Sequence, residues 1–237
     1  RKLTELYRAG RLDCSHITTV NLDEYLGLSA GHPQSYRSFM RKNLFDGIGL
    51  SADRTFFPEI PERLSDCRKN IPPSIGGIRN ETNQDIETAL AETCRQYDEL
   101  LRSLGGTDLQ LLGIGRNGHI GFNEPGDTFI RNTHTVMLAE DTRQANSRFF
   151  SSIDDVPTRA CTMGIGGIFS AKKILLLANG AQKAQALQAA FCGPVTPQVP
   201  ASILQLHPDV TVIADEAAGQ LLADGLSARR KPTFAVP

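Results

Sequence analysis

Several kinds of pattern are missing from the 237-residue sequence. No apolar run approaches the roughly 18 residues that a membrane-spanning helix requires, and no secretory segment opens the chain. The formal net charge is −1, so the total charge gives no indication of a nucleic-acid or membrane partner. Together these absences lead us to expect a cytoplasmic protein with neither kind of partner.

The cysteine and histidine patterns that hold disulfides or metals are missing too. The five cysteines are odd in number and scattered, without CxxC spacing: Cys14, Cys67, Cys94, Cys161 and Cys192. Four of the five histidines also lack a metal-ligand spacing: His16, His32, His134 and His207. We therefore expect reduced thiols, no required metal and no cofactor.

The sequence does contain short apolar runs, and these alternate with stretches whose apolar residues recur at the period of a helix. Strands are predicted at 17–22, 109–113, 133–138, 173–177 and 210–214, and helices at 83–104, 141–150 and 182–191. This alternation predicts an α/β fold, with an open, mostly parallel sheet and helices on both faces (Rossmann-like), in a single domain over 1–237. Four prolines and two glycines in 58–85 interrupt the pattern, so we interpret about 60–82 as an inserted surface loop.

The stretch GIGRNGHIGFNEPG, residues 113–126, directly follows a predicted strand. Its glycines allow the backbone to turn sharply and to approach a ligand closely. His119 lies between two of them, and histidine suits proton shuttling near neutral pH, while Glu124 is placed to orient the ring. The alternative is a glycine-rich turn with a solvated histidine. A dinucleotide site is disfavoured, because Asn-Glu-Pro after Gly-x-Gly-x-x-Gly does not begin a helix.

Three further stretches place polar residues near the ends of predicted elements. NLDEY at 21–25 puts two adjacent carboxylates after a strand, where they serve either as acid and base or as caps of the next element. Arg143 and Arg148, five apart on one predicted helix, either bind an anion or form surface pairs. The turn at 180–183 joins a helix start to Lys183, which suits either an anion site or an exposed lysine.

Taken together, NLDEY at 21–25, GIGRNGHIGFNEP at 113–125, TRQANSRFF at 142–150 and the Gly-x-x-Lys turn at 180–183 resemble the glucosamine-6-phosphate deaminase family. The match runs in order from Tyr7 to about Ala217, and GHIGFNEP is its specific signature. The resemblance implies a small phosphosugar substrate and a metal-free reaction. Glucosamine 6-phosphate and water would give fructose 6-phosphate and ammonia, by an aldose–ketose isomerisation coupled to deamination.

The resemblance also implies roles for individual residues. Asp23 would move a proton between C2 and C1 of the sugar. His119 would assist ring opening with the support of Glu124. Arg148 and Lys183 would bind the phosphate.

The sequence departs from the family at three places, one of which is the apparent insertion at about 60–82 described above. Asn117 stands where some members have aspartate, and we expect its amide to orient the imidazole by a hydrogen bond. The family begins with a βα unit whose Gly-Gly-Thr-Pro loop holds the phosphate, and we expect this unit to be missing from the chain as given. Two alternatives stay open: a 6-phosphogluconolactonase-like hydrolase and a non-enzymatic phosphosugar-sensing domain. The sequence does not decide between a monomer and a homo-oligomer.

Overall fold

The computed structural model describes residues 1–60, 81–222 and 233–235. The predicted insertion at about 60–82 therefore falls almost entirely outside the described residues. The chain divides into two compact units, one of residues 1–97 and 135–162 and one of residues 98–134 and 163–237. These are called unit 1 and unit 2 below, and the single domain expected from the sequence stays a prediction.

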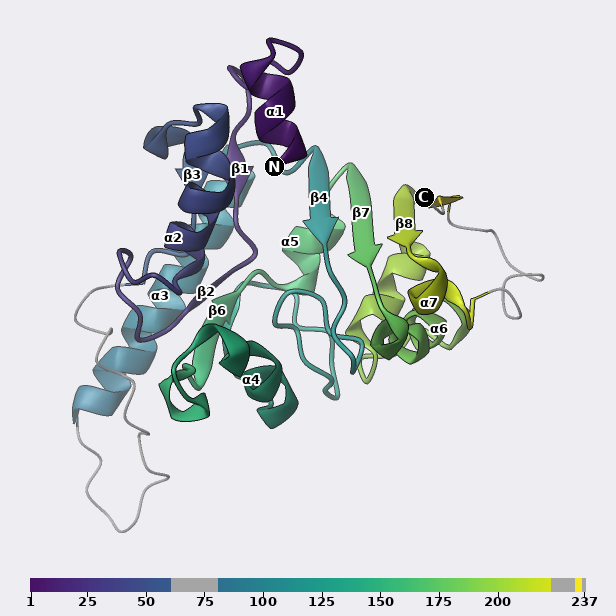
Figure 1. The fold of residues 1–237 in the computed structure, drawn as a ribbon. Coiled ribbons are helices and arrows are strands. Elements are labelled where there is room, and N and C mark those ends of the chain that lie inside the picture. The colour runs from purple at the N-terminus through teal and green to yellow at the C-terminus, as the bar shows by residue number, and fades with distance from the viewer. Residues whose placement is uncertain (61–80, 223–232, 236–237) are drawn as a thin grey trace. The chain divides into compact units, whose positions relative to one another are not determined.

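Unit 1 contains two small groups of paired strands (Figure 1). Strand β1 (Thr19–Val20) pairs in parallel with β3 (Thr55–Phe56). Strand β2 (Asp23–Tyr25) pairs in antiparallel fashion with β6 (Arg159–Thr162), and β5 (His134–Met137) lies on the other side of β6. The predicted strand at 17–22 is thus shorter than expected, and the carboxylates after it lie on a strand of their own.

The helices associated with this unit are α1 (Lys2–Arg8), α2 (Tyr36–Met40), α4 (Glu140–Asn146) and α3 (Glu81–Ser103), whose last turns belong to unit 2. A π-helical turn over Arg41–Phe45 extends α2, and a 3-10 turn over Ser147–Phe149 extends α4. The predicted helix at 83–104 is confirmed. Two glycines with positive φ, Gly105 and Gly106, follow the helix and end it.

Side chains from α3 hold the β2–β6 pair in place. Leu90 and Cys94 of α3 pack with Leu26, which follows β2, and with Cys161 of β6 in one buried cluster. Tyr97, one helical turn further on, donates its hydroxyl hydrogen bond to the carbonyl of Asn21, just before β2. The apolar stripe of α3 therefore fixes the strands on which the NLDEY motif lies.

Unit 2 is built on a four-stranded parallel sheet with the order β4-β7-β8-β9 (Figure 1). The strands are β4 (Leu109–Leu112), β7 (Lys173–Ala178), β8 (Val210–Ala214) and β9 (Thr233–Ala235). Its helices are α5 (Ile165–Phe169), α6 (Ala184–Cys192) and α7 (Glu216–Gly219). The prediction of an α/β, open, mostly parallel, Rossmann-like fold is confirmed.

Alternate residues of the sheet differ in burial, as the two-residue period of a strand requires. Ile174 and Leu176 of β7 and Val212 of β8 are at most 1% exposed, and they form the core with helix residues such as Leu187. On the alternate positions, Leu109 and Leu111 of β4 are 55% and 53% exposed. The carboxyl end of β4 leads into the glycine-rich segment 113–126, which is where ligand sites of parallel sheets collect.

Within the part of the chain that the structure describes, no helix has both the length and the apolar character needed to cross a membrane.

Candidate active site

The glycine-rich loop after β4 is closed by its own backbone. The amide of Gly115 donates to the carbonyl of His119 at 2.9 Å, and the amide of Gly118 donates back to Gly115 at 3.1 Å. Gly118 has a φ of +85°, a conformation that favours glycine. A β-carbon at position 115 would lie 2.4 Å from Cε1 of His119, so glycine is needed there because the imidazole packs on the backbone.

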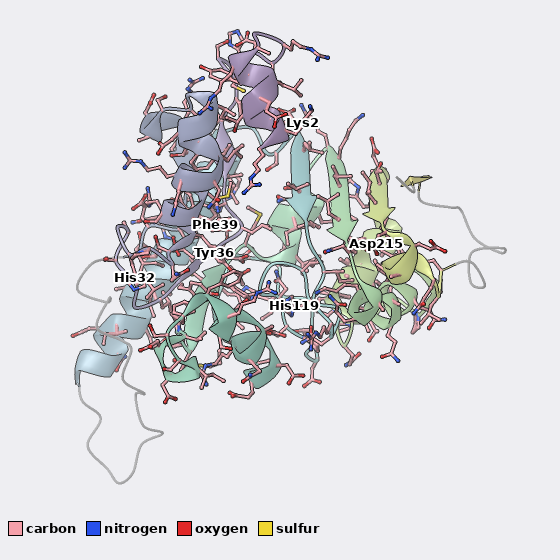
Figure 2. All side chains as sticks on the ribbon, in the orientation of Figure 1. Lys2, His32, Tyr36, Phe39, His119 and Asp215 are labelled. Carbon is pink, nitrogen blue, oxygen red and sulfur yellow. The ribbon has the colours of Figure 1, made fainter. Side chains whose placement is uncertain are left out.

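The loop brings His119, Glu124 and Asn117 into one hydrogen-bonded group. Nδ1 of His119 lies 3.3 Å from Oε2 of Glu124, and both side chains are largely buried. Because an ionised carboxylate only accepts, Nδ1 carries the proton and donates it, which leaves Nε2 as the acceptor of the neutral ring. Figure 2 labels His119 in the loop that follows β4.

Asn117 orients this group differently from the expectation. Its Nδ2 donates to Oε2 of Glu124 at 2.7 Å, and its Oδ1 accepts the backbone N–H of His119 at 3.2 Å. The asparagine therefore acts on the imidazole through the glutamate and the backbone, because its two amide atoms have different partners. An aspartate at 117 would place a second carboxylate against Glu124, where the amide now donates.

Lys183 lies against the same loop. It ends a 3-10 turn over Ala181–Lys183 that precedes α6, and its Nζ donates to the carbonyl of Ile114 at 2.6 Å. Two backbone amides of the segment 180–183 already have protein partners. The amide of Gly180 donates to both carboxylate oxygens of Asp215 at 3.0 Å, and the amide of Lys183 donates to Gly180. Asp215, labelled in Figure 2, also caps α7.

In unit 1 the two carboxylates of NLDEY separate into different roles. Asp23 lies opposite Thr162 in the β2–β6 pair and accepts a hydrogen bond from the Thr162 hydroxyl. Glu24 is 6% exposed and accepts the backbone N–H groups of Tyr25, Tyr36 and Arg37 at 2.9–3.0 Å. Desolvation raises the pKa of Glu24, and these three donors work in the opposite direction. The capping alternative is therefore correct for Glu24, which satisfies the first amides of α2.

Three tyrosines surround this region: Tyr25 is the last residue of the NLDEY motif, whereas Tyr36 and Tyr97 lie outside the quoted motifs. The rings of Tyr25 and Tyr36 stack with their centroids 5.0 Å apart. Burial raises the pKa values of Tyr25, Tyr36 and Tyr97, and the nearby Asp23 charge adds to each increase. The three phenols therefore stay protonated near neutral pH. The hydroxyl partner of Tyr97 is distant in sequence, so no local pattern indicates this contact.

The two candidate arginines also differ in the partners of their guanidinium groups. Arg143 of α4 forms an ion pair with Glu140 at 3.1 Å and donates to the carbonyl of Ile153 at 3.0 Å. Arg148, in the 3-10 turn that follows, is exposed, and its guanidinium carbon lies 4.6 Å from the centroid of the Phe149 ring. Of the two, Arg148 is the side chain whose charge is not already paired by a carboxylate among the described residues.

The predicted site residues thus fall into two groups. Asn117, His119, Glu124 and Lys183 come together around one loop of unit 2, whereas Asp23 and Arg148 belong to unit 1. Among the described residues, no group of three or more His, Cys, Asp or Glu side chains suits a metal ion. Unit 2 therefore holds an imidazole, a carboxylate and an ammonium group around its loop, and unit 1 holds a carboxylate that accepts a hydrogen bond from a hydroxyl.

Comparison with known proteins gives a consistent result. Residues 1–213 match the model of the family described as glucosamine-6-phosphate isomerases/6-phosphogluconolactonases. A glucosamine-6-phosphate deaminase of Clostridium perfringens (strain 13 / Type A) is 46% identical over 222 residues, which cover 94% of this chain and 81% of that protein. One of Lachnoclostridium phytofermentans is 49% identical over 213 residues, covering 90% and 80%.

Solved structures agree with the sequence relatives. The structure of a glucosamine-6-phosphate deaminase described as monomeric is 46% identical and matches with a TM-score of 0.78 over 93% of this chain and 81% of its own. A 6-phosphogluconolactonase of Trypanosoma brucei matches with a TM-score of 0.59 at 17% identity over 93% of this chain and 78% of its own, which shows a shared fold alone. The chain therefore belongs to the glucosamine-6-phosphate deaminase family.

Proposed function

We propose that this protein is an enzyme of amino-sugar metabolism in the cytoplasm, which converts glucosamine 6-phosphate and water into fructose 6-phosphate and ammonia. The observation that carries the proposal is the hydrogen-bonded group of His119, Glu124 and Asn117 in the loop after β4. Such a group can move a proton between two oxygens without a metal. The identity of 46–49% to glucosamine-6-phosphate deaminases supports the choice of substrate.

His119 opens the sugar ring in this proposal. The closed hemiacetal must lose a proton from its anomeric hydroxyl and gain one on the ring oxygen. The Nε2 atom of a neutral imidazole can accept the first proton and return it to the second position. Glu124 fixes the ring through Nδ1 and stabilises the imidazolium that exists between the two transfers.

Asp23 carries the isomerisation. In the open chain, C2 lies next to the aldehyde, so a carboxylate can remove its proton and return it to C1. With a second proton passing from the amino group to O1, the product is an imine at C2 with a hydroxyl at C1, and water attacks this imine with the release of ammonia. Glu24 does not serve as this base, because its oxygens are engaged by three backbone amides. Asp23, in contrast, is held by the Thr162 side chain and is only partly buried.

Lys183 and Arg148 bind the phosphate group. An ammonium and a guanidinium provide the charge-assisted hydrogen bonds that a phosphate dianion requires. Arg143 is excluded from this role because the Glu140 carboxylate already pairs its charge. Binding energy at the phosphate, remote from the reacting carbons, fixes the orientation of the sugar.

The decisive experiment compares two substrates with the same purified protein. Ammonia release from glucosamine 6-phosphate, measured by a coupled assay, is the expected activity, and hydrolysis of 6-phosphogluconolactone should be absent. The opposite result would establish the lactonase alternative, and phosphosugar binding without turnover of either substrate would favour a sensing domain. One solved relative is described as monomeric, and light scattering on this protein decides between a monomer and a homo-oligomer.

A further inference from the structure

We propose that Thr162 is a positioning residue of the proton transfer, which holds the Asp23 carboxylate by donating a hydrogen bond to it. This inference rests on the proposed function, since it requires Asp23 to act as the base. Thr162 belongs to no motif that the sequence singled out. It is the last residue of β6 and lies far from NLDEY in the sequence.

The strand register brings the two side chains together. In the antiparallel pair of β2 and β6, Asp23 lies directly opposite Thr162, Glu24 opposite Cys161 and Tyr25 opposite Ala160. Residues directly opposite each other point to the same face, with their Cβ atoms about 4.5–5.5 Å apart. The Thr162 hydroxyl therefore reaches Oδ1 of Asp23 across one strand spacing.

The chemistry fixes the direction of this hydrogen bond. An ionised carboxylate has no proton to give, so the hydroxyl of Thr162 must be the donor. A hydrogen bond to the charged form stabilises it, and the bond restrains rotation of the carboxylate about its own axis. Threonine is also stiff at χ1 because it is β-branched, so its oxygen is itself well positioned.

A positioning role requires a buried Thr162 and an Asp23 that stays accessible, and the burial of the two residues differs in this way. Thr162 is 0% exposed, whereas Asp23 is partly exposed on the same face of the strand pair. The hydroxyl is therefore set in the core of unit 1, and the carboxylate projects from it. Cys161, the neighbour of Thr162, packs in the buried cluster of α3 and β6, which keeps the end of β6 in place.

A matched pair of substitutions separates positioning from packing. Thr162→Val keeps the shape of the side chain and removes the hydroxyl, and Thr162→Ser keeps the hydroxyl. Thr55→Val is the control: Thr55 is 8% exposed in the same unit, and its hydroxyl donates to the Ala52 carbonyl at 3.0 Å, not to Asp23. We expect Thr162→Val to lower kcat by about 10- to 100-fold, the range for losing a hydrogen bond to a charged group, with KM nearly unchanged.

The double variant with Asp23→Asn makes the test specific. If Thr162 acts through Asp23, adding Thr162→Val to Asp23→Asn should cause no further loss in the residual kcat of the Asp23→Asn variant. Thr162→Ser should recover most of the lost kcat, and Thr55→Val should stay within about threefold of the parent, the spread we allow for a distant site. Circular dichroism confirms folding, and Thr162→Ala replaces the valine variant in the same cycle if that variant unfolds.

The inference fails if Thr162→Val keeps the parental kcat, if the serine variant is no better than valine, or if the two losses multiply in the double variant. The proposed function fails separately, through absence of ammonia release by the unaltered protein. Exchange that persists in Asp23→Asn would instead overturn the assignment of the base. The three failures therefore give different results in the same set of assays.

Discussion

Replacing Gly115 by alanine should displace the His119 imidazole, which we propose to open the sugar ring, without disturbing the fold. Gly115 is not among the glycines with positive φ, so its backbone conformation tolerates alanine. The added Cβ would lie 2.4 Å from Cε1 of His119 and 2.5 Å from both ring nitrogens. An ordinary contact begins near 3.4 Å, so the ring must move by about 1 Å. The bond between His119 and Glu124, now 3.3 Å, would be lost or rebuilt in another orientation.

A misplacement of about 1 Å at a reacting group can reduce turnover about 100-fold, or about 2.7 kcal/mol in activation free energy. We therefore expect Gly115→Ala to lower kcat/KM for closed-ring glucosamine 6-phosphate by about this factor. Binding of an open-chain amino-alditol phosphate, which has no ring to open, should change little. The assays are coupled ammonia release and competitive inhibition by the alditol.

The same loop provides a control. A Cβ at Gly113 would meet nothing within 4 Å, and this glycine is not among those with positive φ, so Gly113→Ala should behave like the parent. Parental activity in Gly115→Ala, or equal losses in the two variants, would refute the role given to the position of His119. Equal weakening of alditol binding and turnover would place the defect in sugar binding and not in ring opening.

Three further predictions address other parts of the proposal. Asp23→Asn should abolish solvent-hydrogen exchange at C1 and C2 while phosphosugar binding, measured by calorimetry, persists; parental exchange would contradict the assignment. Arg148→Ala and Lys183→Ala should each raise the Kd for phosphorylated sugars by roughly 10-fold or more, as expected for a charge-assisted hydrogen bond, and Arg143→Ala serves as the paired-arginine control with an unchanged Kd. Burial raises the pKa of Glu24 in the folded state, so the contribution of Glu24 to the free energy of unfolding is present at low pH and decreases as pH rises through that pKa. Chemical denaturation between about pH 4 and pH 8 should show this decrease in the free energy of unfolding in the parent and not in Glu24→Gln.

Much of the fold follows from local sequence. The β-branched run at 210–214 coincides with β8, and the apolar residues at three- and four-residue steps in 83–104 match α3. His119 and Glu124 could be identified for the same reason, because they lie five residues apart in one loop whose glycines fix the backbone. Patterns of this kind depend on neighbours in the chain, which a sequence displays directly.

Other features depend on pairings that the sequence does not display. Asp23 was expected after a strand and lies on one, because β2 exists only through its pairing with β6, whose residue Thr162 is 139 positions away. The contact of Lys183 with the Ile114 carbonyl likewise requires β4 and β7 to be adjacent.

The sequence by itself thus determined the fold class, the family and the chemical character of the loop after β4. Only the tertiary structure decided which of two adjacent carboxylates is held by a hydroxyl and which by three backbone amides, and which of two arginines is already paired. The physical reason is that hydrogen bonds and ion pairs are chosen by distance in space, and side chains of the same type differ only in the partners that the fold brings within reach.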